Sequence, residues 1–141
     1  MLNKAISIAA LAHAGQVDKG HSPYILHPLR VMLAMNTELE RVCAVLHDVI
    51  EDSTVTLDDL RQEKFSEEVI ETLSVLTKRQ NEDYDAFIDR VLMNETACRV
   101  KLADIEDNMD LNRIPNPGEK DRARLKKYKA AKERIEDRLQ M

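Results

Sequence analysis

The sequence is poor in glycine, proline and aromatic residues. Its 141 residues include 3 Gly, 4 Pro and no Trp, and aromatic residues make up 4% of the chain. Sandwiches and barrels of short strands need frequent turns, which Gly and Pro normally supply. The scarcity therefore favours long helices, and the 43% of hydrophobic residues must build the core mainly from Leu, Ile, Val, Ala and Met.

Cysteine and long apolar runs are equally scarce. The two cysteines, Cys43 and Cys98, form no disulfide framework and match no zinc-binding spacing. No apolar run approaches the roughly 20 residues that span a membrane, and the N-terminal segment "MLNKAISIAALAHAG" is typical of an amphipathic helix rather than of a signal peptide. We therefore expect a cytoplasmic protein without a membrane partner.

A basic block is also missing. The formal net charge is −5, from 21 Lys and Arg against 26 Asp and Glu. Because nucleic-acid-binding proteins present a basic surface, we expect no nucleic-acid partner. A small anionic substrate remains possible, since a bound metal and a few local Lys or Arg side chains reverse the field inside a cleft. The sequence assigns no oligomeric state.

Apolar periodicity predicts an all-α fold of six to eight helices. At this length the simplest organisation is one domain over residues 1–141, long enough to bury a core without staples. The helix over 38–52 is apolar nearly all round, so we expect it to be central. The predicted helices cover residues 3–14, a segment opened by Pro28, residues 38–52, a segment starting at Ser66, and residues 84–93, 95–111 and 119–139.

One short stretch, "AVLHDVIEDS" at residues 44–53, ends an apolar segment with a cluster of ionisable groups. The four residues are His47, Asp48, Glu51 and Asp52. Residues three and four apart share a helical face, so a continuous helix would bring these side chains together. Such a cluster is costly without partners, and a divalent metal accepts imidazole nitrogen and carboxylate oxygen together. The alternative is an acidic helix end exposed to solvent.

Two further segments carry candidate metal ligands. His27 precedes a proline in "PYILHPLRV", and Asp104 follows an apolar run in "VKLADIEDNMDL". Taken alone, the histidine would be a core residue and the aspartate a solvated one. In the order H…HD…D, however, the three segments resemble the HD superfamily of metal-dependent phosphohydrolases. The stretches "AHAGQVDKGHSPYILHP", "LHDVIED" and "VKLADIEDNMDL" are similar to the hydrolase domain of the RelA/SpoT family and its small stand-alone members.

This resemblance covers about residues 4–130 and implies both a fold and an activity. The fold is a compact helical bundle around one metal, and the activity is removal of pyrophosphate from the 3′ position of ppGpp and pppGpp. The implied metal is Mn²⁺, although other transition metals suit a mixed nitrogen and oxygen ligand set. No synthetase domain is expected, since the sequence ends at Met141. The implied metal ligands are His27, His47, Asp48 and Asp104.

The resemblance also implies residues for catalysis and for substrate binding. Glu51 and Asp52 match an acidic pair beside the metal, which would orient the attacking water and accept its proton. Solvation of a helix end is their alternative role. The alternatives for the substrate residues are a surface charge for Lys101 and a core aromatic position for Tyr128. The implied substrate-binding residues are Lys19, Lys101, Asn108 and Tyr128.

Two departures from the family pattern bear on the substrate. Alarmone hydrolases usually carry an Arg-Lys pair in the first loop, with the arginine stacked on guanine, whereas this chain has Asp18-Lys19. After the aspartate that corresponds to Asp104, the family usually has a basic residue, then Leu, then His or Tyr. This chain has Ile105, Glu106 and Asp107 at those positions. Besides ppGpp hydrolysis, two alternatives stay open. One is hydrolysis of another nucleotide or dinucleotide, and the other is a non-catalytic module that senses a nucleotide.

Overall fold

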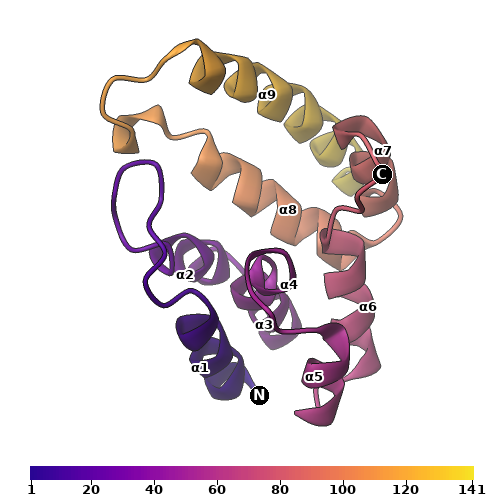
Figure 1. The fold of residues 1–141 in the computed structure, drawn as a ribbon. Coiled ribbons are helices and arrows are strands. Elements are labelled where there is room, and N and C mark those ends of the chain that lie inside the picture. Colours follow the sequence, from indigo (N-terminus) through magenta and orange to yellow (C-terminus); the bar gives the residue numbers. More distant parts are fainter.

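The computed structural model describes residues 1–141 and is built from helices joined by loops (Figure 1). Eight helices have six residues or more, as the sequence predicts, and an isolated bridge between Val17 and Pro23 is the only β-type pairing. The helices are α1 (Leu2–Ala12), α2 (Leu26–Leu33), α3 (Glu38–Leu46), α5 (Leu57–Gln62), α6 (Glu67–Leu76), α7 (Tyr84–Val91), α8 (Glu95–Asn108) and α9 (Glu119–Leu139). A four-residue helix, α4 (Val49–Asp52), and a 3₁₀ turn, η1 (Leu111–Arg113), complete the chain.

Helix α3 lies at the centre of the fold, which confirms the expectation from its apolar sequence. A capping box begins the helix, because Thr37 accepts the Glu40 amide and the Glu40 carboxylate accepts the Thr37 amide. Such a cap is worth about 1 kcal/mol. Residues 42–46 are all buried, and the helix packs against α1, α2, α6 and α8. The C-terminal end of α3 is thereby held firmly in the core.

The predicted single helix over residues 38–52 is wrong, because α3 ends at Leu46. The His47 ring places Nδ1 2.5 Å from the Ala44 carbonyl oxygen and so competes with the backbone for that acceptor. The His47 amide also bonds Ala44, over three residues rather than four. Asp48 then begins the short helix α4. His47 and Asp48 therefore lie at a break between two helices and not on one helical face.

Smaller differences concern two other helix boundaries and one additional helix. Helix α2 begins at Leu26 rather than Pro28, so His27 lies in its first turn. Helix α8 ends at Asn108 and not at 111, and η1 follows it. Helix α5 was not predicted; it begins with a capping box between Thr56 and Asp59. Short helices of this kind lack the several turns of periodicity that sequence patterns need.

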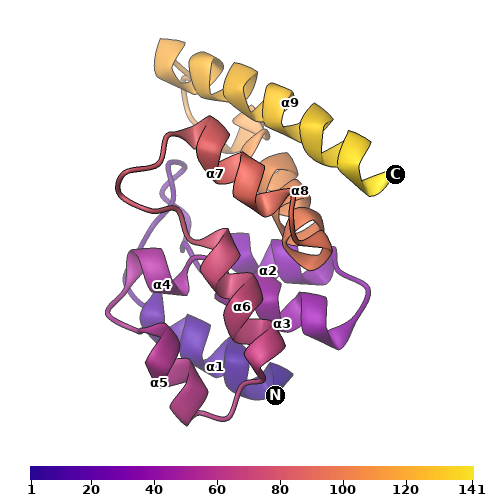
Figure 2. The same ribbon diagram turned by 90° about the vertical axis from the view of Figure 1, so that its right-hand side faces the viewer.

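Helices α8 and α9 run side by side in opposite directions and form one side of the molecule, with α1, α2 and α3 on the other (Figure 1). Figure 2 shows α7 beside α8 on the same side as α9. The loop between α1 and α2 reaches η1, where a Cβ atom on Gly20 would lie 2.0 Å from the Arg113 carbonyl oxygen. Only glycine permits this approach. No helix combines the length and apolar character needed to cross a membrane.

Candidate metal centre

The structure brings the four predicted ligands together from three separate parts of the chain. His27 comes from the first turn of α2, His47 and Asp48 from the break after α3, and Asp104 from α8. One ligand atom from each residue lies within 4.8 Å of the others. His27, His47 and Asp104 are only 3–4% exposed, so the cluster is largely closed to solvent.

Both histidines direct Nε2 toward the two carboxylates. His27 Nε2 lies 2.8 Å from Asp104 Oδ1 and 3.6 Å from Asp48 Oδ2. His47 Nε2 lies 3.1 Å from Asp48 Oδ2 and 3.3 Å from Asp104 Oδ1, and it is a buried nitrogen without a hydrogen-bond partner. A buried polar atom of this kind calls for a partner.

The outer nitrogen of each imidazole contacts an oxygen outside the cluster. His27 Nδ1 lies 2.6 Å from Asp107 Oδ2, and His47 Nδ1 lies 2.5 Å from the Ala44 carbonyl oxygen. An acceptor at Nδ1 favours the proton there and leaves the Nε2 lone pair for a cation. Two imidazoles and two carboxylates would balance a dication, which also offsets the repulsion between the acids. These residues therefore fit one divalent transition metal.

Two further side chains, Tyr24 and Asn108, hold the carboxylates of the cluster in place. Tyr24 donates its hydroxyl to Asp48 Oδ2 at 2.6 Å, and Asn108 donates to Asp104 Oδ1 at 3.0 Å. Burial raises the pKa of the Tyr24 hydroxyl, and the charge of Asp48 raises it further, so this group stays a donor. The sequence analysis missed Tyr24, although it lies three residues before His27 in the chain.

Lys101 is not the surface charge that the sequence left open as an alternative. Its side chain is 14% exposed, and Nζ donates to Asp104 Oδ2 at 2.8 Å while lying 5.1 Å from the centre of the Phe87 ring. Burial raises the pKa of Asp104, but Lys101, His47 and His27 together outweigh it and hold that pKa well below its usual range. Lys101 therefore helps to keep a cluster carboxylate ionised.

Glu51 and Asp52 lie on α4, which directly follows Asp48, and both are exposed. Glu51 Oε1 accepts the Lys78 amide at 2.7 Å, which ties it to the loop after α6. Desolvation by neighbouring atoms raises the pKa of each carboxyl, and the negative charge of Asp48 raises both further. Each is therefore a better proton acceptor than a free carboxylate, which suits a general base.

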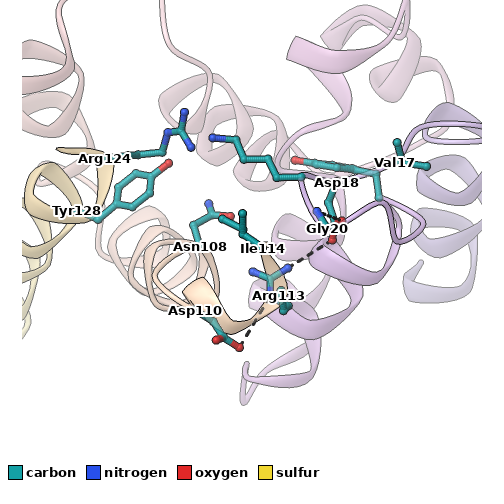
Figure 3. Close-up of a pocket in the computed structure, with 11 residues that line it drawn as sticks. Val17, Asp18, Gly20, Asn108, Asp110, Arg113, Ile114, Arg124 and Tyr128 are labelled. Carbon is teal, nitrogen blue, oxygen red and sulfur yellow. Dashed lines mark hydrogen bonds and ion pairs between the residues drawn. The ribbon is translucent and has the colours of Figure 1, made fainter. Parts of the chain in front are cut away.

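A cavity of about 380 Å³ adjoins the cluster (Figure 3). Its walls are the loop at residues 17–20, the segment at residues 108–114, and the N-terminal half of α9. Tyr24 and Asn108 line the cavity and also bond the cluster carboxylates, so the two sites share a boundary. The predicted residues Lys19, Asn108 and Tyr128 line it, whereas Lys101 does not.

Two arginines of the cavity were missed from the sequence. Arg124 comes from α9 and Arg113 from η1, on different walls (Figure 3). No local pattern marks either residue, because only the tertiary fold brings them to the cavity. Asp18 accepts the amides of Gly20 and Ser22 through Oδ1, and its Oδ2 lies 3.5 Å from Arg113 Nη1. The Asp18 side chain therefore stabilises the conformation of the loop, while Arg113 supplies a guanidinium group to the cavity.

The unexpected acids after Asp104 do not line this cavity. Glu106 is exposed and borders a separate depression beside Ala103. Asp107 contacts His27 and two arginines instead. The cavity therefore lacks the two negative charges that the sequence appeared to place near a phosphate.

The chain is similar to known proteins in sequence and in fold, although no protein-family model matches it. It is 33% identical over 122 residues to the guanosine-3′,5′-bis(diphosphate) 3′-pyrophosphohydrolase of Vibrio cholerae and 34% identical over 122 residues to the bifunctional (p)ppGpp synthase/hydrolase SpoT of Escherichia coli. Each match covers 77% of this chain and 17% of the relative. Among solved structures, a metazoan ortholog of SpoT has a TM-score of 0.76 at 22% identity, with 98% of this chain and 84% of that chain covered.

Proposed function

Because this chain is related to the RelA/SpoT-type (p)ppGpp hydrolases over 77% of its length, we propose that it is a metal-dependent phosphohydrolase of phosphorylated nucleotides. The best single substrate is guanosine 3′,5′-bis(diphosphate), which would lose its 3′-pyrophosphate. Both relatives are named as hydrolases of ppGpp or (p)ppGpp, and the metazoan SpoT ortholog is described as hydrolysing ppGpp. The chain spans 17% of the length of each of these two relatives, and we therefore propose this reaction for the chain.

The observation that carries the proposal is the convergence of four ligand atoms within 4.8 Å beside a cavity of about 380 Å³. A volume of this order lies within the usual range for small-molecule sites. His27, His47, Asp48 and Asp104 would hold the metal, and Mn²⁺ suits their mixed nitrogen and oxygen donors. When bound, such a dication lowers the pKa of water and offsets negative charge on phosphorus.

Glu51 and Asp52 are the proposed catalytic residues. Both are exposed and lie on the short helix that directly follows Asp48. There they would orient the attacking water and accept its proton, a task that a raised carboxyl pKa favours. The Lys78 amide fixes the direction of Glu51, so we assign it the orienting role.

The cavity residues are proposed to bind the nucleotide. Lys19, Arg113 and Arg124 bring cationic groups to its walls, which suits phosphate oxygens. Tyr128 offers a ring on which a base can stack. Asn108 would place the substrate against the metal, since it lines the cavity and bonds Asp104.

One observation favours the alternative substrate class, another nucleotide or a dinucleotide. Asp18 shapes its own loop and offers no ring-stacking guanidinium, so another nucleotide or dinucleotide could replace the guanine alarmone. The non-catalytic sensing module loses its support, since Glu106 and Asp107 do not line the cavity. We also propose a cytoplasmic location, because both cysteines are free and buried.

The proposal is tested by incubating the purified protein and Mn²⁺ with ppGpp and with a panel of nucleoside phosphates and dinucleotides. We expect release of pyrophosphate from ppGpp and recovery of GDP, both absent with Asp104→Ala. Parallel assays with Mg²⁺ and Zn²⁺ would test the choice of metal. Turnover of another compound in the panel alone would replace the substrate. No turnover of any compound, by a protein that binds Mn²⁺, would contradict the enzymatic function.

A further inference from the structure

We propose that Asp107 is a positioning residue that holds His27 with its Nε2 atom toward the other metal ligands. This inference rests on the metal centre proposed above. Asp107 is one of the residues in which the chain departs from the RelA/SpoT pattern, so the family resemblance assigns it no role. Its place in the structure does.

Helix α8 contacts both nitrogens of the His27 ring. Asp104 Oδ1 lies 2.8 Å from Nε2, and Asp107 Oδ2 lies 2.6 Å from Nδ1. The two aspartates are three residues apart, so they share one face of the helix. The His27 side chain is 4% exposed and that of Asp107 is 15% exposed, which leaves water little access to this contact. The ring therefore cannot turn without losing a hydrogen bond at Nδ1.

Two arginines fix the Asp107 carboxylate. Arg30 donates Nε to Oδ1 at 2.7 Å and Nη2 to Oδ2 at 3.0 Å, a bidentate pair that sets the carboxylate plane. Arg113 lies 3.3 Å from Oδ2 through Nη2 and also donates to the Asp107 carbonyl oxygen.

This arrangement is the one by which proteins tune a metal-binding histidine. A carboxylate at the outer nitrogen fixes the tautomer and ring orientation and makes the inner nitrogen a stronger donor. Arg113 extends the support to the wall of the cavity, because it contacts Asp107 and lines that cavity. The extra acid in the "DIEDN" stretch therefore acts on His27 and not on the phosphates of a substrate.

The test compares Asp107→Ala, the nearly isosteric Asp107→Asn, and the matched control Glu106→Gln, an exposed acid on the same helix. Isothermal titration with MnCl₂ measures the dissociation constant and the number of sites. We expect a weakening of about 10- to 100-fold for Asp107→Ala. Asp107→Asn should be affected less, since its amide oxygen still accepts a hydrogen bond, and the control should bind as the wild type does.

A purely structural role would lower the number of sites or the melting temperature without weakening the remaining sites. The number of sites should therefore stay at one for each variant that circular dichroism shows to be folded. The electron paramagnetic resonance spectrum of bound Mn²⁺ should change with Asp107→Ala and not with Glu106→Gln. An unchanged dissociation constant for Asp107→Ala, or equal weakening by the control, would overturn the role of Asp107. A wild-type protein that binds no Mn²⁺ would overturn the metal centre itself.

Discussion

The metal cluster and the adjoining cavity are built in different ways. The cluster side chains come from packed helices and from the break between α3 and α4, and three of the four residues are at most 4% exposed. The cavity is walled by a loop, a 3₁₀ turn and the start of α9, and its cations are more open to solvent. The exposed fractions are 50% for the Lys19 side chain, 33% for Arg124 and 28% for Arg113.

This difference separates the proposed metal ligands from the proposed substrate-binding residues. The proposed ligands are placed by the core, where a shift of one side chain costs packing energy. The proposed substrate-binding residues lie on segments where substitutions are tolerated, as is usual for binding loops on a rigid scaffold. A loop residue such as Asp18 can therefore differ from the family pattern while the cluster stays complete. Apart from Arg113, which lines the cavity and also contacts Asp107, substrate preference and metal binding should respond to different mutations.

The largest effect is expected from removing a ligand. Asp104→Ala or His47→Ala should abolish both the rise in melting temperature on adding Mn²⁺ and the phosphohydrolase activity, because each removes one of the four proposed ligands and leaves three. Differential scanning fluorimetry with and without Mn²⁺ measures the first effect and a pyrophosphate assay the second. Retained stabilisation by Mn²⁺ in both variants would place the metal elsewhere.

The next effect concerns the acidic pair. Glu51→Gln combined with Asp52→Asn should keep the Mn²⁺ affinity but lower kcat by about 10²- to 10⁴-fold, the usual range for general acid–base groups. Steady-state kinetics and titration with MnCl₂ separate the two quantities. Loss of metal binding in this variant would mean that the pair belongs to the ligand set, and an unchanged kcat would mean that both acids only solvate the helix end.

A smaller effect is expected at the cavity wall. Arg124→Ala should raise KM about tenfold, since hydrogen bonds to charged groups contribute roughly 1.5–3 kcal/mol, with little change in Mn²⁺ affinity. Arg122→Ala removes the same charge from an exposed position on α9 and should leave KM unchanged. An equal effect of both substitutions would point to long-range attraction by the helix rather than to a contact in the cavity.

Gly20→Ala tests whether the cavity depends on the contact between its two loops. The added Cβ would lie 2.0 Å from the Arg113 carbonyl oxygen, so the loop and η1 must move apart, and KM should rise a few-fold. Gly118→Ala is the matched control, because a Cβ there meets nothing within 4 Å. A change in Mn²⁺ affinity with Gly20→Ala would show that the cluster and cavity are not independent.

The smallest effect is expected for Glu82, which lies in the same loop as Lys78, whose amide bonds Glu51. Hydrogen bonds from Arg90 lower the pKa of Glu82 from 4.5 to about 2. A lowered pKa stabilises the fold above the unfolded value of 4.5, and this contribution disappears as the pH falls toward 2. Glu82→Gln should therefore lower the melting temperature at pH 7 and have no effect near pH 2, by thermal denaturation. A difference that persists at pH 2 would have another cause.

The same contrast explains how much could be predicted from the sequence. Apolar periodicity located the central helix α3 and the charged helix α9 over residues 119–139, because both are several turns long. The three motifs named the residues that the fold brings together at the cluster. The break at His47 could not be predicted, because it depends on the contact between His47 Nδ1 and the Ala44 carbonyl oxygen. The role of Asp107 could not be predicted because its partners His27 and Arg30 are distant in sequence, and that of Arg113 could not because only the fold brings it to the cavity.

The most direct test is the anomalous diffraction of crystals grown with Mn²⁺. One peak should lie among the Nε2 atoms of His27 and His47 and the carboxylates of Asp48 and Asp104. Density for a nucleotide phosphate, in crystals soaked with ppGpp, should approach that peak from the cavity beside Asn108. A peak outside the cluster would contradict the metal centre. So would the absence of any peak, with the four side chains pointing away from one another.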